Sequence, residues 1–529
     1  MAGLSRNTGL RSAPFHVALF CVYPVLALLG VNTSEMTPAE ALWPLGIAAA
    51  VGLALVAACV ILRCPARICI ALSLAVILVL SYGHGRRLLG NALATEPGEG
   101  SQDAFFWIWL AATVVAVAVV IVSVRSGRRI TSLLNTVGAA LVAVGACTFV
   151  MGATRQSSVS VTSSGDEPLD STITAASTGP RPDIYYIIFD RYGNERVLSD
   201  TYGCDNSEIG RWLRERGFSV STRSHANYLK TAVSLASSLN YEYLDDLRLP
   251  GDQECTNWVL AQKKIKNHRV SRFLKARGYR YYHFGSWWNG TQRNEHADVN
   301  VNPVAANEFT VLLWKTMLLH PLFIHSGTVS RIVGVRGREQ DYQRVVLALE
   351  QLQRLPEAPE PTFAFVHLLA PHPPYVFDRN GKFLSYRQSR KRGDSLNYVE
   401  QVMFVNSRIR ALVDTLLLRS PTPPVIILQA DEGPFPRRYQ KDQKGFRWTT
   451  ATRRELQQKM GIFYAAYLPG DTAAAVYEGI TPVNTFRVVF NRYFDAGLPL
   501  LPDTSFAFPD AQHLYSFYSV NDSLGYEER

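Results

Sequence analysis

Five long apolar runs in the first 153 residues limit what this 529-residue chain can fold into. They lie near residues 15–32, 41–62, 66–83, 104–124 and 130–152. Each reaches or approaches the length of a helix that crosses a bilayer core of roughly 30 Å. A helix is required because lipid offers no partner for open backbone groups. We therefore predict five transmembrane helices, of which 66–83 is the weakest; the alternative is four spans and one interfacial helix.

The charges between these runs predict how the bundle is oriented. Two arginines, Arg86 and Arg87, flank the runs on one side of the membrane, and seven flank them on the other. The seven are Arg6, Arg11, Arg63, Arg67, Arg125, Arg128 and Arg129. Cytoplasmic loops carry the arginine excess, so we expect a cytoplasmic amino terminus, a first run that is an uncleaved span, and location in the plasma (inner) membrane. Five crossings then place everything after residue 153 outside the cytoplasm.

The remaining chain divides into a linker and a soluble domain. Residues 154–180 are rich in Ser and Thr and show no apolar periodicity, which is typical of a linker. Residues 181–529 alternate short apolar strands with helices, which predicts an exported α/β domain with a mostly parallel sheet. The expected strands are 183–190, 279–284, 362–369, 425–429 and 462–467, and the expected helices are 206–216, 231–240, 256–276, 339–354 and 396–419.

Composition excludes several classes of protein. Seven cysteines are too few for a disulfide scaffold. Cys204 and Cys255 are the two in the exported domain, where a disulfide and two free thiols are both open. The exported part has a net charge near +6, because residues 1–153 hold nine arginines and five acids of a chain whose net charge is +10, and this favours anionic partners such as lipid head groups or phosphate-bearing polymers. It is too dilute to indicate nucleic acid, and no motif for nucleic-acid binding is present.

Carboxylates directly follow two of the expected strands. Asp190 ends the strand 183–190, and Asp431 and Glu432 follow the strand 425–429. Ligand sites form at the carboxyl ends of parallel strands, and adjacent carboxylates are costly unless a cation bridges them. The pattern therefore indicates a metal site, while an ordinary polar strand end is the alternative for each.

A hydroxyl and an imidazole occupy two further notable positions. Thr231 would open a small-residue helix, where free N–H groups and the helix dipole stabilise an alkoxide or a phosphoryl group. A plain helix cap is the alternative, and Ser234 is the fallback nucleophile. His372 lies in a proline-fixed turn and suits anion binding or proton donation, with a structural histidine as the alternative.

In order and spacing, these segments resemble the alkaline phosphatase/sulfatase superfamily over about residues 181–520. The resemblance rests on Tyr185–Gly193, Ser234–Asn240 and His367–Tyr375 taken together. With five amino-terminal spans, the chain is similar to lipoteichoic-acid synthases and lipid A phosphoethanolamine transferases.

The resemblance implies a role for particular residues. Thr231 would be the nucleophile, beside one divalent ion, either Mn²⁺, Zn²⁺ or Mg²⁺. The implied metal ligands are Asp190, Thr231, Asp431 and Glu432. His372 would contact the anionic group of the substrate, and His225 and Asn227, which lie near the nucleophile in sequence, would assist.

Two departures from the family pattern shape the expected function. The family usually has Asp-His-Gly where this chain has Asp431-Glu432-Gly433, and an all-oxygen site leans from Zn²⁺ toward Mn²⁺ or Mg²⁺. Residues 230–234 lack the Cys/Ser-x-Pro-x-Arg of sulfatases, and threonine cannot form the formylglycine aldehyde.

We therefore expect metal-dependent transfer, or hydrolysis, of a phospho-substituent through a covalent threonine intermediate. The donor would be a membrane lipid and the acceptor an envelope glycan or lipid. The alternatives are an inactive relative that binds an envelope polymer, and an exported sulfatase or phosphodiesterase.

Two apolar features have less specific interpretations. The run 309–323 is expected to be a core helix of the exported domain, with a position on the membrane surface as the alternative. Trp287 and Trp288 are expected to pack internally, with stacking on a sugar ring as the alternative.

Overall fold

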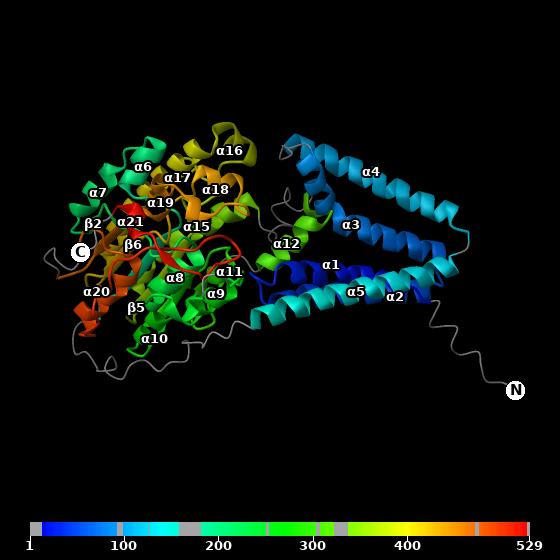
Figure 1. The fold of residues 1–529 in the computed structure, drawn as a ribbon, viewed down its shortest axis with the longest axis horizontal. Helices are drawn as coiled ribbons and strands as arrows, with labels where there is room; N and C mark the ends of the chain where they lie inside the picture. Colours follow the sequence, from blue (N-terminus) through cyan, green and yellow to red (C-terminus); the bar gives the residue numbers. More distant parts are fainter. Residues whose placement is uncertain are drawn as a thin grey trace. The chain divides into compact units, whose positions relative to one another are not determined.

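The computed structural model describes residues 13–92, 99–125, 127–157, 181–249, 253–302, 307–321, 337–470 and 476–525. It has two compact units (Figure 1). The membrane unit comprises Met1–Val159 and Ala305–Gly337, and the α/β unit comprises Ser160–Val304 and Arg338–Arg529. The expected linker lies outside the described residues, apart from 154–157, which continue the last membrane helix.

The membrane unit contains the five predicted apolar helices. They are α1 (His16–Val31), α2 (Pro38–Ile61), α3 (Ala66–Ala92), α4 (Glu99–Ser123) and α5 (Arg128–Ser157). By length and composition, α2 to α5 each contain a segment able to cross a membrane. The short helix is α1, whose 16 residues span about 24 Å, and it packs against α2, α3 and α5. The run 66–83, expected to be the weakest span, belongs to a 24-residue apolar segment.

One further helix, α12 (Glu308–Thr316), packs in the membrane unit. Its cap, Asn307, donates a hydrogen bond from Nδ2 to the carbonyl of Glu40 at 2.9 Å. Phe309 and Leu313 are buried in a cluster with apolar residues of α1 and α2. The expectation that this run forms a core helix of the exported domain is therefore wrong for residues 309–321, and 322–323 lie outside the described residues.

The α/β unit is built on a mixed, mostly parallel seven-stranded sheet, as predicted. The strand order is β2-β7-β6-β1-β5-β3-β4. The strands are β1 (Ile184–Phe189), β2 (Ser219–Ser221), β3 (Arg280–Phe284), β4 (Val299–Val301), β5 (Thr362–Leu368), β6 (Val425–Gln429) and β7 (Tyr464–Tyr467). β7 runs antiparallel to β6 and β2, and the other pairs are parallel.

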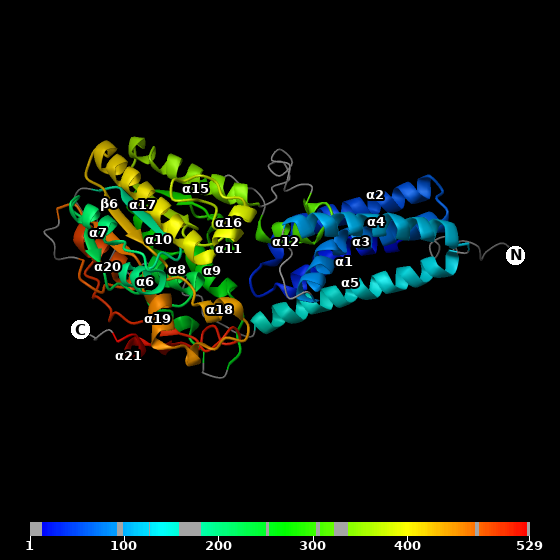
Figure 2. The same ribbon diagram turned by 90° about the horizontal axis from the view of Figure 1, so that it is seen from above.

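Helices cover both faces of this sheet (Figure 2). Tyr186 of β1 packs edge-on against Phe486 of α20, with ring centroids 4.9 Å apart, which joins one face of the sheet to its covering helices. The helices are α6 (Glu195–Tyr202), α7 (Ser207–Arg214), α8 (Thr231–Asn240), α9 (Val259–Lys266), α10 (Arg269–Lys275), α11 (Asn289–Gln292), α15 (Arg338–Leu352), α16 (Tyr386–Arg392), α17 (Asp394–Arg419), α18 (Arg437–Lys441), α19 (Arg453–Met460), α20 (Pro482–Phe494) and α21 (Asn521–Leu524).

Most predicted helices agree with the structure, and one prediction was too coarse. The expected helix 256–276 is two helices, α9 and α10. The helix is interrupted before His268. The Nδ1 of His268 accepts a hydrogen bond from the backbone N–H of Ser271 at 3.0 Å and so caps α10. A histidine cap is an unusual signal, because Ser, Thr, Asp and Asn are the common caps.

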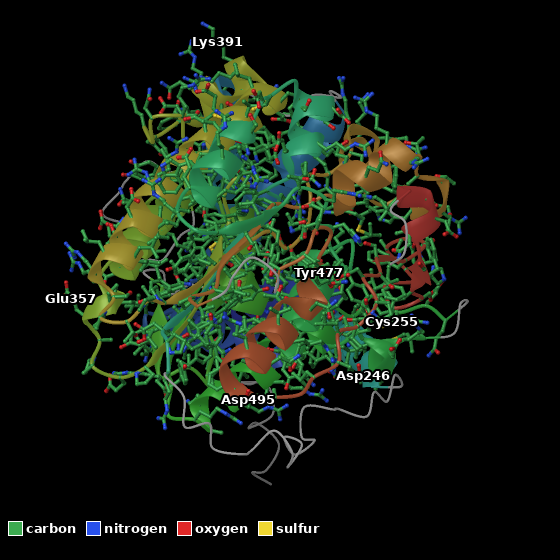
Figure 3. All side chains as sticks on the ribbon, turned by 90° about the vertical axis from the view of Figure 1, so that its left-hand side faces the viewer. Asp246, Cys255, Glu357, Lys391, Tyr477 and Asp495 are labelled. Carbon is green, nitrogen blue, oxygen red and sulfur yellow. The ribbon has the colours of Figure 1, made fainter. Side chains whose placement is uncertain are left out.

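The two cysteines of the α/β unit are free thiols. Cys204 and Cys255 are both buried and not bonded to one another. Figure 3 shows Cys255 within this unit, together with charged side chains that extend outward, such as Glu357 and Lys391. Lys391 belongs to the basic end of α16, which is a solvated surface.

Candidate metal centre

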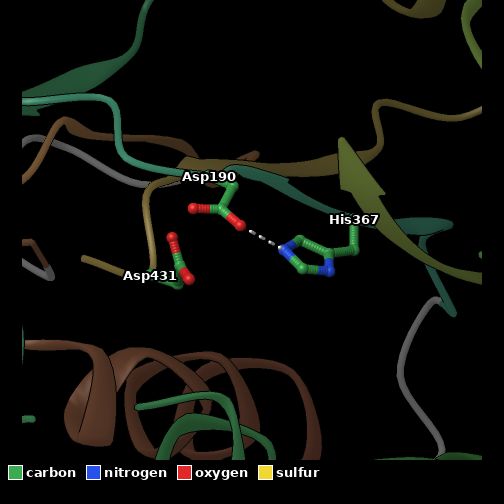
Figure 4. Close-up of side chains that lie close together, drawn as sticks. All are labelled: Asp190, His367 and Asp431. Atoms are coloured by element: carbon green, nitrogen blue, oxygen red, sulfur yellow. Dashed lines mark ion pairs between the residues drawn. The ribbon is translucent and has the colours of Figure 1, made fainter. Parts of the chain in front are cut away.

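The central strand β1 and its two parallel neighbours bring three potential ligands together. Ile188 of β1 lies opposite His367 of β5 and Gln429 of β6. Two residues further along, Asp190 and Asp431 lie just after the ends of β1 and β6. One ligand atom from each of Asp190, His367 and Asp431 lies within 4.8 Å of the other two (Figure 4). The grouping follows directly from parallel pairing, because the carboxyl ends of neighbouring strands meet at one edge.

The polar atoms of this group fit a metal ion. Asp190 Oδ1, His367 Nε2 and Asp431 Oδ2 are buried and have no hydrogen-bond partner. A buried polar atom without a partner costs free energy, and several at one point indicate a group that would satisfy them. Carboxylate oxygens with one imidazole nitrogen are ligands for Zn²⁺ or Mn²⁺. The residues present therefore fit a divalent cation.

A hydroxyl holds His367 in the orientation that a ligand needs. Its Nδ1 lies 2.7 Å from Thr291 Oγ1, and Nε2 lies 3.5 Å from Asp190 Oδ2. Thr291 Oγ1 is also 2.8 Å from Ser286 Oγ. With a proton on Nδ1 donated to Thr291, the lone pair of Nε2 points at the carboxylates. A hydrogen bond on the far nitrogen is the usual way in which a ligating histidine is fixed.

Arg191 adopts a conformation that places its own amide against the site. It is a non-glycine residue with φ of +64°, in the sparsely populated left-handed region. Its backbone N–H donates to Asp431 Oδ1 at 3.3 Å. Its side-chain Nε lies 3.0 Å from Glu432 Oε1 and 3.9 Å from Asp190 Oδ1. One residue therefore contacts all three carboxylates at the edge of the sheet.

Glu432, predicted as a metal ligand, has cations as its partners in the structure. Its Oε1 lies 2.8 Å from Lys459 Nζ, and the two side chains are 1% and 0% exposed. Lys459 Nζ also donates to the carbonyl of Gly433 at 3.1 Å. Glu432 lies outside the group of three that could hold a metal. Its Oε1 is therefore the counter-ion of Lys459 and Arg191, while its Oε2 is buried with no hydrogen-bond partner.

The backbone contact that holds Lys459 beside Glu432 requires glycine at position 433. Gly433 N–H donates to the carbonyl of Lys459 at 2.8 Å. A Cβ on Gly433 would lie 2.3 Å from the carbonyl oxygen of Gln458, so no other residue fits without a shift of the backbone. The Asp-Glu-Gly sequence thus docks onto the end of α19.

Three cationic side chains of the site lie over the ring of Phe435. Arg191, Lys230 and Lys459 lie 4.0, 4.0 and 3.7 Å from the ring centroid. Such contacts are favourable because the ring face carries partial negative charge. They hold three positive charges beside three carboxylates.

Thr231 is the first residue of α8, as the sequence predicted. Its side chain lies close enough to Asp431 to lower the pKa of that carboxyl. Ser234, the fallback nucleophile, is buried and donates from Oγ to the carbonyl of Asp431 at 2.6 Å. The Ser234 hydroxyl ties α8 to the strand end, and the Thr231 hydroxyl faces the carboxylate.

Burial and charge give the two aspartates opposite character. Burial, together with the Asp190 and Glu432 carboxylates, raises the pKa of Asp431 well above its usual range, and the Thr231 side chain opposes this. Burial alone would raise the pKa of Asp190, but the nearby His372, His367 and Arg191 side chains lower it. Asp431 is therefore the more basic carboxylate.

His372 lies at the edge of the same group. Burial and the Arg191 guanidinium lower the pKa of His372. Its ring centroid is 5.8 Å from that of Trp287, and the ring of Trp288 is 6.2 Å from that of His367. The paired tryptophans thus lie beside His367 of β5 and beside His372, which follows that strand.

His225 and Asn227 are held by contacts within the protein. His225 Nδ1 is 2.7 Å from Ser505 Oγ. Asn227 donates from Nδ2 to the carbonyl of Thr504 at 2.9 Å, and its Oδ1 accepts from Val483 N–H at 2.8 Å. Both side chains are buried, and these bonds join the segment before α8 to the carboxy-terminal part of the unit.

The family model that matches this chain is Sulfatase, over residues 182–466. That match covers more than half of the chain and includes every residue of the site described above. The chain belongs to the sulfatase family. The predicted membership of the alkaline phosphatase superfamily is thereby confirmed. Comparison with curated proteins gives no significant match.

Solved structures that resemble this sulfatase-family chain include membrane enzymes. A zinc complex of the C-terminal periplasmic domain of EcEptC from Escherichia coli is 13% identical, with a TM-score of 0.43, covering 67% of this chain and 98% of that one. The integral membrane lipooligosaccharide phosphoethanolamine transferase A of Neisseria meningitidis is 10% identical, with a TM-score of 0.39, covering 90% and 95%.

Proposed function

We propose that this sulfatase-family protein transfers a phospho-substituent from a membrane lipid to an envelope glycan or lipid, or to water. Asp190, His367 and Asp431 would hold one divalent ion. The observation that carries the proposal is the Thr231 hydroxyl at the start of α8, beside the Asp431 carboxylate of a group with three unpartnered ligand atoms. The bound ion would supply Lewis-acid stabilisation of phosphoryl oxygens.

The first step joins Thr231 to the substrate. Thr231 Oγ attacks the phosphorus of the lipid donor and gives up its hydroxyl proton. The bond between phosphorus and the lipid oxygen breaks, and the lipid oxygen takes that proton and leaves as an alcohol. The positive end of the α8 dipole stabilises the negative charge on the phosphoryl group. The product of this step is a phospho-threonine ester.

The second step transfers the phosphoryl group from Thr231 to the acceptor. A hydroxyl of the acceptor attacks the same phosphorus and loses its proton. The Thr231 Oγ–phosphorus bond breaks, and Thr231 regains the proton. Arg191 and His372, which both interact electrostatically with Asp190, would contact the oxygens of the transferred group. The fixed cations Lys459 and Lys230 keep the surroundings of the anion positive.

The membrane unit supports a lipid as the donor. An enzyme with apolar helices resides in the same layer as its donor, which raises the effective concentration of the two partners. We propose that the α/β unit lies on the non-cytoplasmic side, since the arginine excess predicts a cytoplasmic amino terminus.

Mass spectrometry of the full chain, isolated from growing cells, tests the proposal. We expect an added mass on the peptide that contains Thr231, and none in Thr231→Ala. Thr231→Ser retains a hydroxyl and should retain part of the adduct. Because the structure leaves Ser234 bonded to the backbone, Ser234→Ala should keep the adduct. Unmodified peptide in an active wild-type enzyme would refute the threonine intermediate, and a metal-free, unmodified protein would support a binding role.

A further inference from the structure

Two arginines of the membrane unit depart from its overall charge distribution. Seven arginines flank the apolar runs on the expected cytoplasmic side, while Arg86 and Arg87 lie at the opposite end of α3. They lie in the last turn of the apolar segment 66–89, at the level where the hydrocarbon core ends. Cations at that level are expected to meet lipid head groups.

The end of α12 is fastened to α3 at this level. The backbone N–H of Leu318 donates to the carbonyl of Val79 at 2.7 Å. Gly83 permits the approach, because a Cβ there would lie 2.2 Å from the carbonyl oxygen of Lys315. Two backbones therefore meet without intervening side chains, which fixes Lys315 beside the last turns of α3.

This junction gathers basic side chains from both segments. Lys315 and Arg87 are exposed, and Arg86 is half-buried. His320 is 7% exposed, and its Nε2 is buried with no hydrogen-bond partner. Burial, then Lys315 and Arg86, lower the pKa of His320 to about 4, so the three groups are electrostatic neighbours. The acid of α12, Glu308, lies in its first turn, about 10 Å along the axis from Lys315.

Aromatic rings surround the same end of α3. Tyr82 packs with Phe105 and Trp109, with ring centroids 5.5 and 6.2 Å away. Trp107 and Leu88 remain 62% and 71% exposed. Aromatic residues of this kind are typical of the boundary between the hydrocarbon and the head groups. The junction therefore offers cations to a phosphate and apolar surface to acyl chains.

We propose that Arg86, Lys315 and His320 form a binding site for the phosphate of a phospholipid head group. The cations neutralise the phosphate, the unpartnered Nε2 of His320 supplies a hydrogen bond, and the exposed apolar side chains contact the acyl chains. A lipid is favoured over free phosphate because apolar surface adjoins the cations. The inference rests on the proposed function only in treating the bound lipid as the donor.

Lipid binding to the full chain in detergent tests the site, with native mass spectrometry as the readout. The three probes are dihexanoyl phosphatidic acid, dihexanoylglycerol and inorganic phosphate. The test variant is Arg86→Gln with Lys315→Gln. Its matched control, Arg67→Gln with Arg128→Gln, removes two cations at the other ends of α3 and α5. All variants carry Thr231→Ala, so that binding is measured without turnover and is independent of the proposed chemistry.

The site predicts a specific pattern of affinities. Each cation contributes about fivefold to binding of an anionic head group, so the double variant should bind phosphatidic acid about 25-fold more weakly. The control should stay within twofold of the parent chain. Dihexanoylglycerol and inorganic phosphate should each bind at least tenfold more weakly than phosphatidic acid.

Other outcomes would overturn the proposal. They are equal phosphatidic acid affinity in the double variant and the parent, equal loss in the control, or equal binding of dihexanoylglycerol. Inorganic phosphate that binds as tightly as the lipid would indicate a free-anion site instead. If the double variant does not fold, Lys315→Gln alone, at an exposed side chain, gives the same test with a fivefold expected loss.

Discussion

Replacing Lys459 by methionine tests how Glu432 is accommodated in the site. The ammonium of Lys459 is fully buried, 2.8 Å from Glu432 Oε1, and it also contacts the Gly433 carbonyl and the Phe435 ring. Methionine has a similar length and no charge. The change would leave the buried Glu432 carboxylate with Arg191 as its remaining cation, at 3.0 Å.

The expected loss of unfolding free energy is about 3 kcal/mol. Removing one partner of a buried pair costs about 3–5 kcal/mol, because the other charge stays buried. The remaining Arg191 places Lys459→Met near the lower end of that range. Adding Glu432→Gln removes the uncompensated charge, so the double variant should recover at least about 1 kcal/mol of the loss.

Denaturant unfolding of the full chain in detergent measures this effect. Lys275→Met is the matched control, because its pair with Asp298 has the same 2.8 Å separation but is more than a third exposed. An exposed pair is worth about 0–1 kcal/mol. A loss below 1 kcal/mol in Lys459→Met, or no recovery in the double variant, would refute the role of Lys459 as counter-ion of Glu432.

Two further substitutions test residues that hold the site in place, His225 and Thr291. Burial lowers the pKa of His225 to about 4 from an ordinary 6.5. Between these pH values the unfolded chain binds a proton on His225 that the folded chain does not bind. The free energy of unfolding should therefore fall by about 3 kcal/mol as the pH drops from 6.5 to 4. His225→Asn should flatten this dependence in unfolding experiments, and an unchanged slope would contradict a buried neutral ring. Thr291→Val removes the hydroxyl that orients His367 and should weaken metal binding 10- to 100-fold in chelator competition. Thr362→Val is the control, because Thr362 begins β5, the strand that contains His367. Equal weakening of metal binding in the two variants would count against orientation of His367 by Thr291.

The sequence predicted the carboxylates of the site because strand ends are local features. Asp190 and Asp431 each follow a continuous apolar run, and parallel pairing of those runs brings them together. The start of α8 at Thr231 was also predicted, since a run of small residues follows it. In these cases the signal and the structure lie within about ten residues of each other.

The partners of those residues depend on contacts that no local pattern reveals. His367 lies inside β5, where only the register with β1 shows that it faces Asp190. Lys459 reaches Glu432 because the backbone at Gly433 docks onto α19, a contact between distant segments. The apolar run of α12 was assigned to the wrong unit because burial against lipid-embedded helices and burial in a soluble core give the same composition. Two signals were available for His367, namely a polar strand residue between apolar neighbours and its place at the start of the His367–Tyr375 segment.

Metal content of the full chain measured against His367→Gln is the most direct test of the site. We expect one divalent ion per wild-type chain by elemental analysis, and less than a tenth of that in His367→Gln after dialysis. Glu432→Gln, which lies outside the group of three, should keep its ion. A wild-type chain that binds no divalent ion, or a His367→Gln chain that binds as much as the wild type, would contradict the account.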